Sequence, residues 1–152
     1  MNKKIVFLLA LCCFISVTGC SKEEIIEHYN QALQVAGDNG LTENKELQGK
    51  RKLGIDSYVG TYKADYDSFS GEEVLFGGTA LERDAGNEIE ISCDTDITDG
   101  TLKLILKTGS DEPQILCDTL QSYSNTIELP SASNYIVVEA ENFTGSFNLI
   151  IQ

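Results

Sequence analysis

The sequence predicts an all-β protein, an antiparallel, jelly-roll-like β-sandwich that follows a signal peptide and a short N-terminal helix. From Tyr58 onward, apolar and polar residues alternate over short runs, which is the period of a half-buried strand. Gly, Asn and Asp separate these runs, and no segment has the pattern of a strand–helix–strand unit. At 152 residues the chain suits one domain, which we place at residues 58–152.

The chain is strongly acidic, with 24 Asp and Glu residues against 11 Lys and Arg and a formal net charge of -13. Because nucleic-acid binding needs clustered Lys and Arg, this balance argues against nucleic acid as a partner. Hydrophobic residues make up 41% of the chain, which is enough to form a buried core.

Residues 1–19 have the organisation of a secretory signal peptide. Lys3 and Lys4 precede an apolar run over residues 5–17 that is too short to span a bilayer comfortably. The segment ends in Val17-Thr18-Gly19-Cys20, which resembles the lipobox of bacterial lipoproteins. The resemblance implies cleavage before Cys20, a diacylglyceryl thioether on its sulfur, and a lipid anchor in the cell membrane on the extracytoplasmic side. A non-lipidated signal with a chance cysteine is the alternative.

Residues 21–36 have the periodicity of a helix. Ser21 and Glu24 fit a capping box, and Gly37 is a suitable C-cap. The apolar residues form one stripe: Ile25, Ile26, Tyr29, Leu33 and Ala36. Because a helix of about 15 residues is marginal alone in water, the stripe needs a partner, which is the β-domain, a second protein or the bilayer surface.

Residues 37–56 are polar and rich in glycine, and they predict a tether or a loosely packed loop. Residues 20–57 are therefore a lipidated N-terminus, a helix and a linker. The linker contains the basic cluster Lys50-Arg51-Lys52, which we interpret as solvated charge. Contact with phosphate headgroups near the anchor is the alternative.

The remaining elements are short strands separated by turn residues. The predicted strands are Tyr58–Lys63, Glu72–Gly77, Thr79–Arg83, Glu88–Asp94, Thr101–Thr108, Gln114–Asp118, Asn125–Leu129, Tyr135–Glu141 and Ser146–Gln152. Strand parity places Cys93 and Cys117 on apolar inner faces. They form either a disulfide or two buried thiols, because spacing alone does not give the geometry of a bond.

Residues 79–152 resemble pre-peptidase C-terminal domains and related jelly-roll modules of secreted bacterial proteins. The resemblance lies in Gly86 with the strand after it, in Asp99–Leu104, in Asn134–Glu139 and in Gly145–Ile150. It implies a jelly-roll-like sandwich and brings no invariant chemical motif. The mature chain also looks like small uncharacterised lipoproteins of Gram-positive bacteria, and that likeness implies no particular activity.

The sequence offers little catalytic chemistry, and we predict no catalytic residues and no cofactor. The chain has one histidine, His28, and no nucleophile, metalloprotease, phosphate-loop or dinucleotide motif. Asp94, Asp96 and Asp99 are candidate calcium ligands. We favour a hairpin with Asp99-Gly100 as its turn, so no metal is expected.

We therefore expect a lipid-anchored, extracytoplasmic lipoprotein whose β-sandwich is a non-catalytic module that binds a protein or glycan of the cell envelope. One alternative is an accessory lipoprotein that tethers a membrane complex through the N-terminal helix. A small hydrolase that uses carboxylates is the other, because acidic residues are plentiful.

Overall fold

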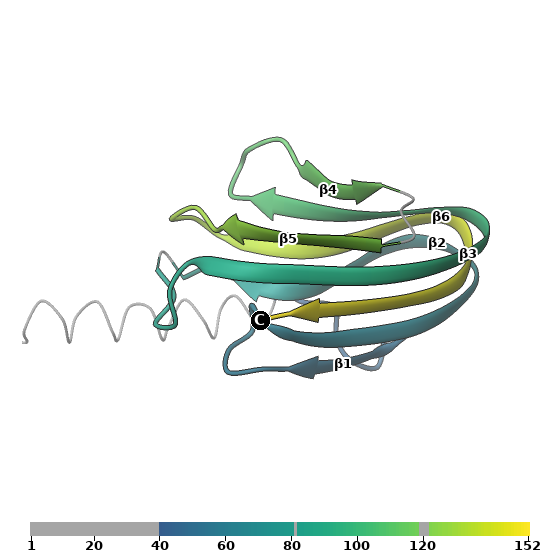
Figure 1. Ribbon diagram of the computed structural model, residues 1–152, viewed down its shortest axis with the longest axis horizontal. Helices are drawn as coiled ribbons and strands as arrows, with labels where there is room; N and C mark the ends of the chain where they lie inside the picture. The colour runs from purple at the N-terminus through teal and green to yellow at the C-terminus, as the bar shows by residue number, and fades with distance from the viewer. Residues whose placement is uncertain (1–39, 81, 119–121) are drawn as a thin grey trace, which may run out of the picture.

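The computed structural model describes residues 40–80, 82–118 and 122–152, which form an all-β structure without helices (Figure 1). The predicted signal peptide, Cys20 and the helix over residues 21–36 lie outside the described residues. Within the described ranges, no helix has the length and apolar character needed to cross a membrane.

Six strands form one antiparallel sheet. They are β1 (Lys50–Leu53), β2 (Gly60–Gly78), β3 (Glu88–Thr108), β4 (Gln114–Asp118), β5 (Ser122–Glu128) and β6 (Asn134–Ile151). Their order across the sheet is β1-β2-β6-β3-β4, and β5 pairs with the first part of β3. The prediction of an all-β antiparallel fold is confirmed.

The long strands β2, β3 and β6 bend near their midpoints (Figure 1). The pairing of β2 with β6 shifts register within residues 66–71, and that of β3 with β6 within residues 97–101. Residues with positive φ lie at the bends: Ser68 (53°), Gly100 (74°) and Asn142 (48°). Bulges and positive φ angles let a strand change direction while it keeps its neighbours.

The bends correct the prediction of a hairpin at Asp99-Gly100. The residues before and after this pair belong to one strand, and both sides pair with the same neighbour. Asp94 pairs with Asn148, and Leu102 pairs with Ala140, all within the β3–β6 ladder. A hairpin and a bend have the same sequence signal, because both place a glycine of positive φ between two alternating runs.

The predicted strand Thr79–Arg83 is a loop in its described residues. Side chains bind the backbone donors that a neighbouring strand would otherwise bind. The Ala80 N–H donates to the Tyr58 hydroxyl, and the Arg83 N–H donates to Asn87 Oδ1. Because these backbone N–H groups already have side-chain acceptors, the segment does not need to pair with a neighbouring strand.

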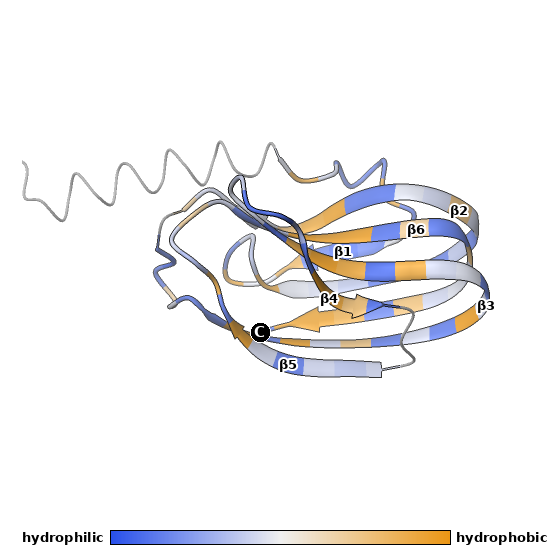
Figure 2. Cartoon of the chain, turned by 90° about the horizontal axis from the view of Figure 1, so that it is seen from above, coloured by the Kyte–Doolittle hydropathy of each residue, from blue (hydrophilic) through white to orange (hydrophobic). Residues whose placement is uncertain are grey.

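The core lies between the two halves of the bent sheet. A single cluster of buried apolar residues includes Ile91 and Leu149 from one half and Leu104 and Val138 from the other. Figure 2 shows the apolar stretches of the long strands side by side, with more hydrophilic residues in the loops at the strand ends. Residues of opposite parity on the same strands face outward, where they are free to contact solvent or a ligand.

The segment before Tyr58 differs from the predicted tether. Leu41 and Leu47 are buried, and β1 pairs with β2. The Arg51 guanidinium reaches inward and donates to the carbonyl oxygens of Val74 (3.2 Å) and Leu75 (3.0 Å). Arg51 lies inward because successive side chains of a strand point to opposite faces, so it is on the face opposite that of Lys50 and Lys52.

Candidate functional site

A row of polar side chains crosses the outward face of the sheet beside the edge strand. Lys50 of β1 lies opposite Lys63 of β2, and Lys63 lies opposite Asn148 of β6. Directly opposed residues of an antiparallel pair have Cβ atoms about 4.5–5.5 Å apart. Both lysines are exposed, so two cationic side chains stand next to each other on a strongly acidic protein.

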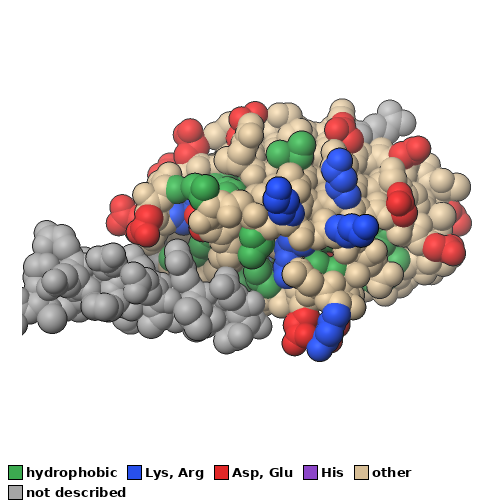
Figure 3. Space-filling view, turned by 90° about the horizontal axis from the view of Figure 1, so that it is seen from below, with side chains coloured by type: hydrophobic (Ala, Val, Ile, Leu, Met, Phe, Trp, Pro, Cys, Tyr) green, Lys and Arg blue, Asp and Glu red, His purple; other side chains and the backbone are tan. Residues whose placement is uncertain are grey.

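These residues line a hollow of about 680 Å³ that is open to solvent. We call it the lysine pocket; its polar lining residues are Gln48, Lys50, Lys63, Asp65, Ser146 and Asn148. Figure 3 shows the molecule from the side on which β1 lies in Figure 1. Lys and Arg side chains gather in the middle of this view, and acidic side chains lie at its margins.

The polar groups of the lysine pocket are not neutralised by one another. The ion pairs between described residues are Lys45–Glu43, Arg83–Asp56 and Lys107–Glu72, and they include neither Lys50 nor Lys63. Asn148 Oδ1 is buried and has no hydrogen-bond partner among the described residues. Most buried polar atoms are hydrogen-bonded, and like charges opposite each other destabilise a sheet. The two exposed lysines of the pocket are therefore available to a ligand.

A buried carboxylate fixes one wall of the lysine pocket. Glu73 is 2% exposed and accepts hydrogen bonds from the Tyr62 hydroxyl (2.8 Å), the Tyr66 hydroxyl and the Gln48 N–H. Burial raises the pKa of both tyrosines above the ordinary value of 10.0, and the hydrogen bonds to Glu73 raise it further. The Gln48 contact ties the segment before β1 to the interior of the sheet.

Gly49 allows this wall to approach β2 closely. A Cβ atom at position 49 would lie 2.3 Å from the Lys63 carbonyl oxygen and 2.6 Å from Ala64 Cβ. A residue with a Cβ atom does not fit at position 49 without displacing the segment that carries Gln48 and Lys50. The shape of the pocket therefore depends on glycine at this position.

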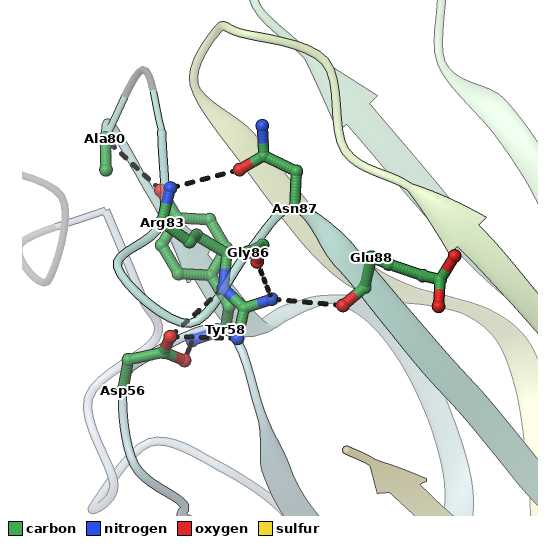
Figure 4. A network of polar contacts seen from close by, with 7 residues as sticks. All are labelled: Asp56, Tyr58, Ala80, Arg83, Gly86, Asn87 and Glu88. Atoms are coloured by element: carbon green, nitrogen blue, oxygen red, sulfur yellow. Dashed lines mark hydrogen bonds and ion pairs between the residues drawn. The ribbon is translucent and has the colours of Figure 1, made fainter.

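A second polar network, centred on Arg83, holds two loops together (Figure 4). The guanidinium donates to Asp56 Oδ2 at 2.9 and 3.0 Å and to the Gly86 carbonyl at 2.8 Å, and it lies 5.4 Å from the centroid of the Tyr58 ring. The Arg83 side chain is 4% exposed. Because Arg83 is enclosed and satisfied by its own loops, it is a structural clamp rather than a ligand-binding residue.

The structure does not bring the predicted calcium candidates together. Asp94 and Asp96 are exposed on the outward face of β3, and Asp99 lies at the bend, where its Oδ1 accepts the Gly100 N–H at 2.9 Å. Across the described ranges, no group of three or more His, Cys, Asp or Glu side chains is arranged to hold a metal ion.

Cys93 and Cys117 come together in the core as buried thiols that form no disulfide. Burial raises the pKa of Cys93 to about 12, and the adjacent Cys117, which hydrogen-bonds to it, contributes to the rise. A thiol of this kind stays protonated and is a poor nucleophile.

Sequence reasoning missed Lys63, Asn148, Glu73 and Arg83. Alternation places Lys63 and Asn148 outward, but only the register between β1, β2 and β6 shows that they share a row with Lys50. Glu73 lies in the predicted strand Glu72–Gly77 beside exposed Glu72, and the two carboxylates look alike in sequence. These positions depend on long-range pairing that no local pattern encodes.

Comparison with protein-family models finds no match, and a search of curated proteins finds no similar sequence either.

Proposed function

We propose that this protein is a lipid-anchored, extracytoplasmic lipoprotein whose β-domain is a non-catalytic binding module of the cell envelope. We further infer that the bent sheet is a β-sandwich of the jelly-roll-like kind, because one core lies between its two halves. The anchor is assigned to Cys20, on the strength of the signal-like segment that precedes it. The partner is an envelope protein or glycan.

The lysine pocket is the observation that carries this proposal. Its side chains offer two cations, an amide, a carboxylate and a hydroxyl on three neighbouring strands. A regular sheet holds such groups at fixed spacing, which suits recognition by charge and hydrogen bonds. The opposed like charges of Lys50 and Lys63 do not stabilise the free protein, so their placement favours a role in binding.

The lipid anchor is tested by metabolic labelling with a fatty-acid analogue and fractionation of the cells. We expect labelled protein in the membrane fraction, and we expect Cys20→Ala to remove the label, because the thioether forms on that sulfur. Cys93→Ala is the matched control and should keep the label. Label retained in Cys20→Ala, or no label in the unaltered protein, would overturn the assignment.

A further inference from the structure

We propose that the lysine pocket binds an anionic glycan, a hydroxyl-rich chain that carries repeated carboxylate or phosphate groups. This inference rests on the proposed binding function and specifies the ligand of the same site. Three features of the pocket favour this ligand: its cations, its acceptors, and the arrangement of charge along β1.

The two opposed lysines create a local site for an anion. The carboxylates on the same face lie farther from Lys63 than Lys50 does. Asp65 is two residues from Lys63 along β2, or about 7 Å, and Asp94 lies two strands away from Lys63, or about 10 Å. The Debye length at physiological salt is about 8 Å, so Asp94 is largely screened. One carboxylate or phosphate between Lys50 and Lys63 relieves their mutual repulsion.

The pocket also contains hydrogen-bond acceptors, so a ligand that fits it needs donor groups in addition to a negative charge. Gln48, Asp65 and Asn148 also line the pocket, and carboxylate and amide oxygens are hydrogen-bond acceptors. A fully deprotonated anion such as sulfate has no donor to offer, whereas the hydroxyl groups of a sugar or polyol do. A ligand that combines an anionic group with hydroxyl groups contacts both the cations and the acceptors of the pocket.

The lysines of β1 favour a polymer over a single sugar. Lys50 and Lys52 occupy successive outward positions on β1, about 7 Å apart, and Lys52 is also exposed and in no ion pair with a described residue. A chain with repeated charges can contact Lys52 while one of its units occupies the pocket. Two contacts on one chain raise the affinity beyond that of either alone.

The test is isothermal titration of the full-length chain, purified in a neutral detergent, with defined ligands. The anionic probes are a galacturonic acid tetramer, which carries carboxylates, and a glycerol phosphate tetramer, which carries phosphates. Maltotetraose is the neutral control, inorganic sulfate is the bare anion, and monomeric galacturonic acid tests the need for a chain. We expect at least one anionic tetramer to bind at least tenfold more tightly than all three controls, and to bind more weakly as salt rises.

Variants locate the binding. Lys50→Gln, Lys63→Gln and Asn148→Leu should each weaken tetramer binding about tenfold, a change of about 1.4 kcal/mol. Lys107→Gln, which removes the same charge from a surface ion pair elsewhere, should change it less than twofold. Lys52→Gln should weaken binding of the tetramer and leave that of the monomer unchanged. Thermal melts confirm that each variant is folded.

Other outcomes overturn the ligand class. Equal binding of maltotetraose shows that charge is not recognised, and equal binding of inorganic sulfate shows that hydroxyl groups are not. Absence of binding, or binding that survives Lys50→Gln and Lys63→Gln together, rejects the acidic glycan as the ligand of this pocket. Lipid labelling at Cys20 is independent of these results, so a failed titration and a failed anchor assignment are distinguishable.

Discussion

Glu73 shows how one buried residue organises the candidate site. Its carboxylate joins two tyrosines of the core to the Gln48 backbone at the wall of the lysine pocket. Its neighbour Glu72 points outward and pairs with Lys107 at the surface. The two adjacent carboxylates therefore have different roles, which alternation assigns to the interior and the exterior of the sheet.

Replacing Glu73 should destabilise the protein strongly. Glu73→Ala removes the acceptor of one backbone N–H and of two buried tyrosine hydroxyls, which keep only their contact with each other, and we expect a loss of about 3 kcal/mol in the free energy of unfolding. Glu72→Ala breaks only an exposed pair and should cost less than about 1 kcal/mol. Urea denaturation of both variants is the measurement; similar losses in the two would show that Glu73 is not an interior anchor.

Stability should fall at alkaline pH. Burial raises the pKa of Cys93 from 9.0 to about 12 and raises those of Tyr62 and Tyr66 above 10.0. Native groups with raised pKa values hold their protons while the unfolded chain loses them. Their contribution is therefore complete below about pH 9 and is lost as pH rises toward the native values. The urea midpoint under reducing conditions should fall between pH 9 and 11.

Cys93→Ala provides the control for this pH dependence. It removes the thiol contribution, so the fall that begins near pH 9 should become shallower, while the part caused by the tyrosines above pH 10 remains. A midpoint that stays constant up to pH 11 in the unaltered protein would contradict the burial of these groups.

At the scale of elements, local patterns predicted strands and their faces but not how the strands connect in space. Alternation correctly indicated an all-β antiparallel fold and the inward parity of Cys93 and Cys117. It divided β2, β3 and β6 at their bends, because bend and turn share the same glycine signal. It also missed β1, a short edge strand of four residues, three of them cationic.

The bend in β3 should depend on glycine at position 100. Gly100 has a φ of 74°, and a Cβ atom there would lie 2.3 Å from the Asn142 carbonyl oxygen. We expect Gly100→Ala to lower the free energy of unfolding by about 3 kcal/mol, from backbone strain and the clash with β6. Gly86 has a similar φ of 89° with no atom within 4 Å, so Gly86→Ala should cost only about 1 kcal/mol.

Chemical denaturation of the two glycine variants compares the strand bend with an open loop. The difference between them isolates the contact with β6, since both carry the strain of a positive φ. Equal losses would mean that β3 and β6 do not approach each other at the bend.

At the scale of the whole molecule, the charge is unevenly distributed. The chain has a net charge of -13, yet Lys50, Lys52 and Lys63 gather on one outward face and form no ion pair with described residues. Sequence alone pointed to Lys50-Arg51-Lys52 as a basic cluster. It could not show that folding turns Arg51 inward and replaces it with Lys63 from β2, because that exchange depends on register.

The central claim is that this protein meets its envelope partner through the lysine pocket. The most direct measurement is photo-crosslinking on intact cells, with the photoreactive residue placed at Ser146 in the pocket, at Ser110 in the loop after β3, or at Leu33 in the predicted helical stripe. We expect Ser146 to give crosslinked envelope material that disappears when Lys50→Gln and Lys63→Gln are combined, and Ser110 to give little. Crosslinking from Leu33 alone, or Ser146 products that persist in the double variant, would contradict the account and favour a protein that docks through its N-terminal helix.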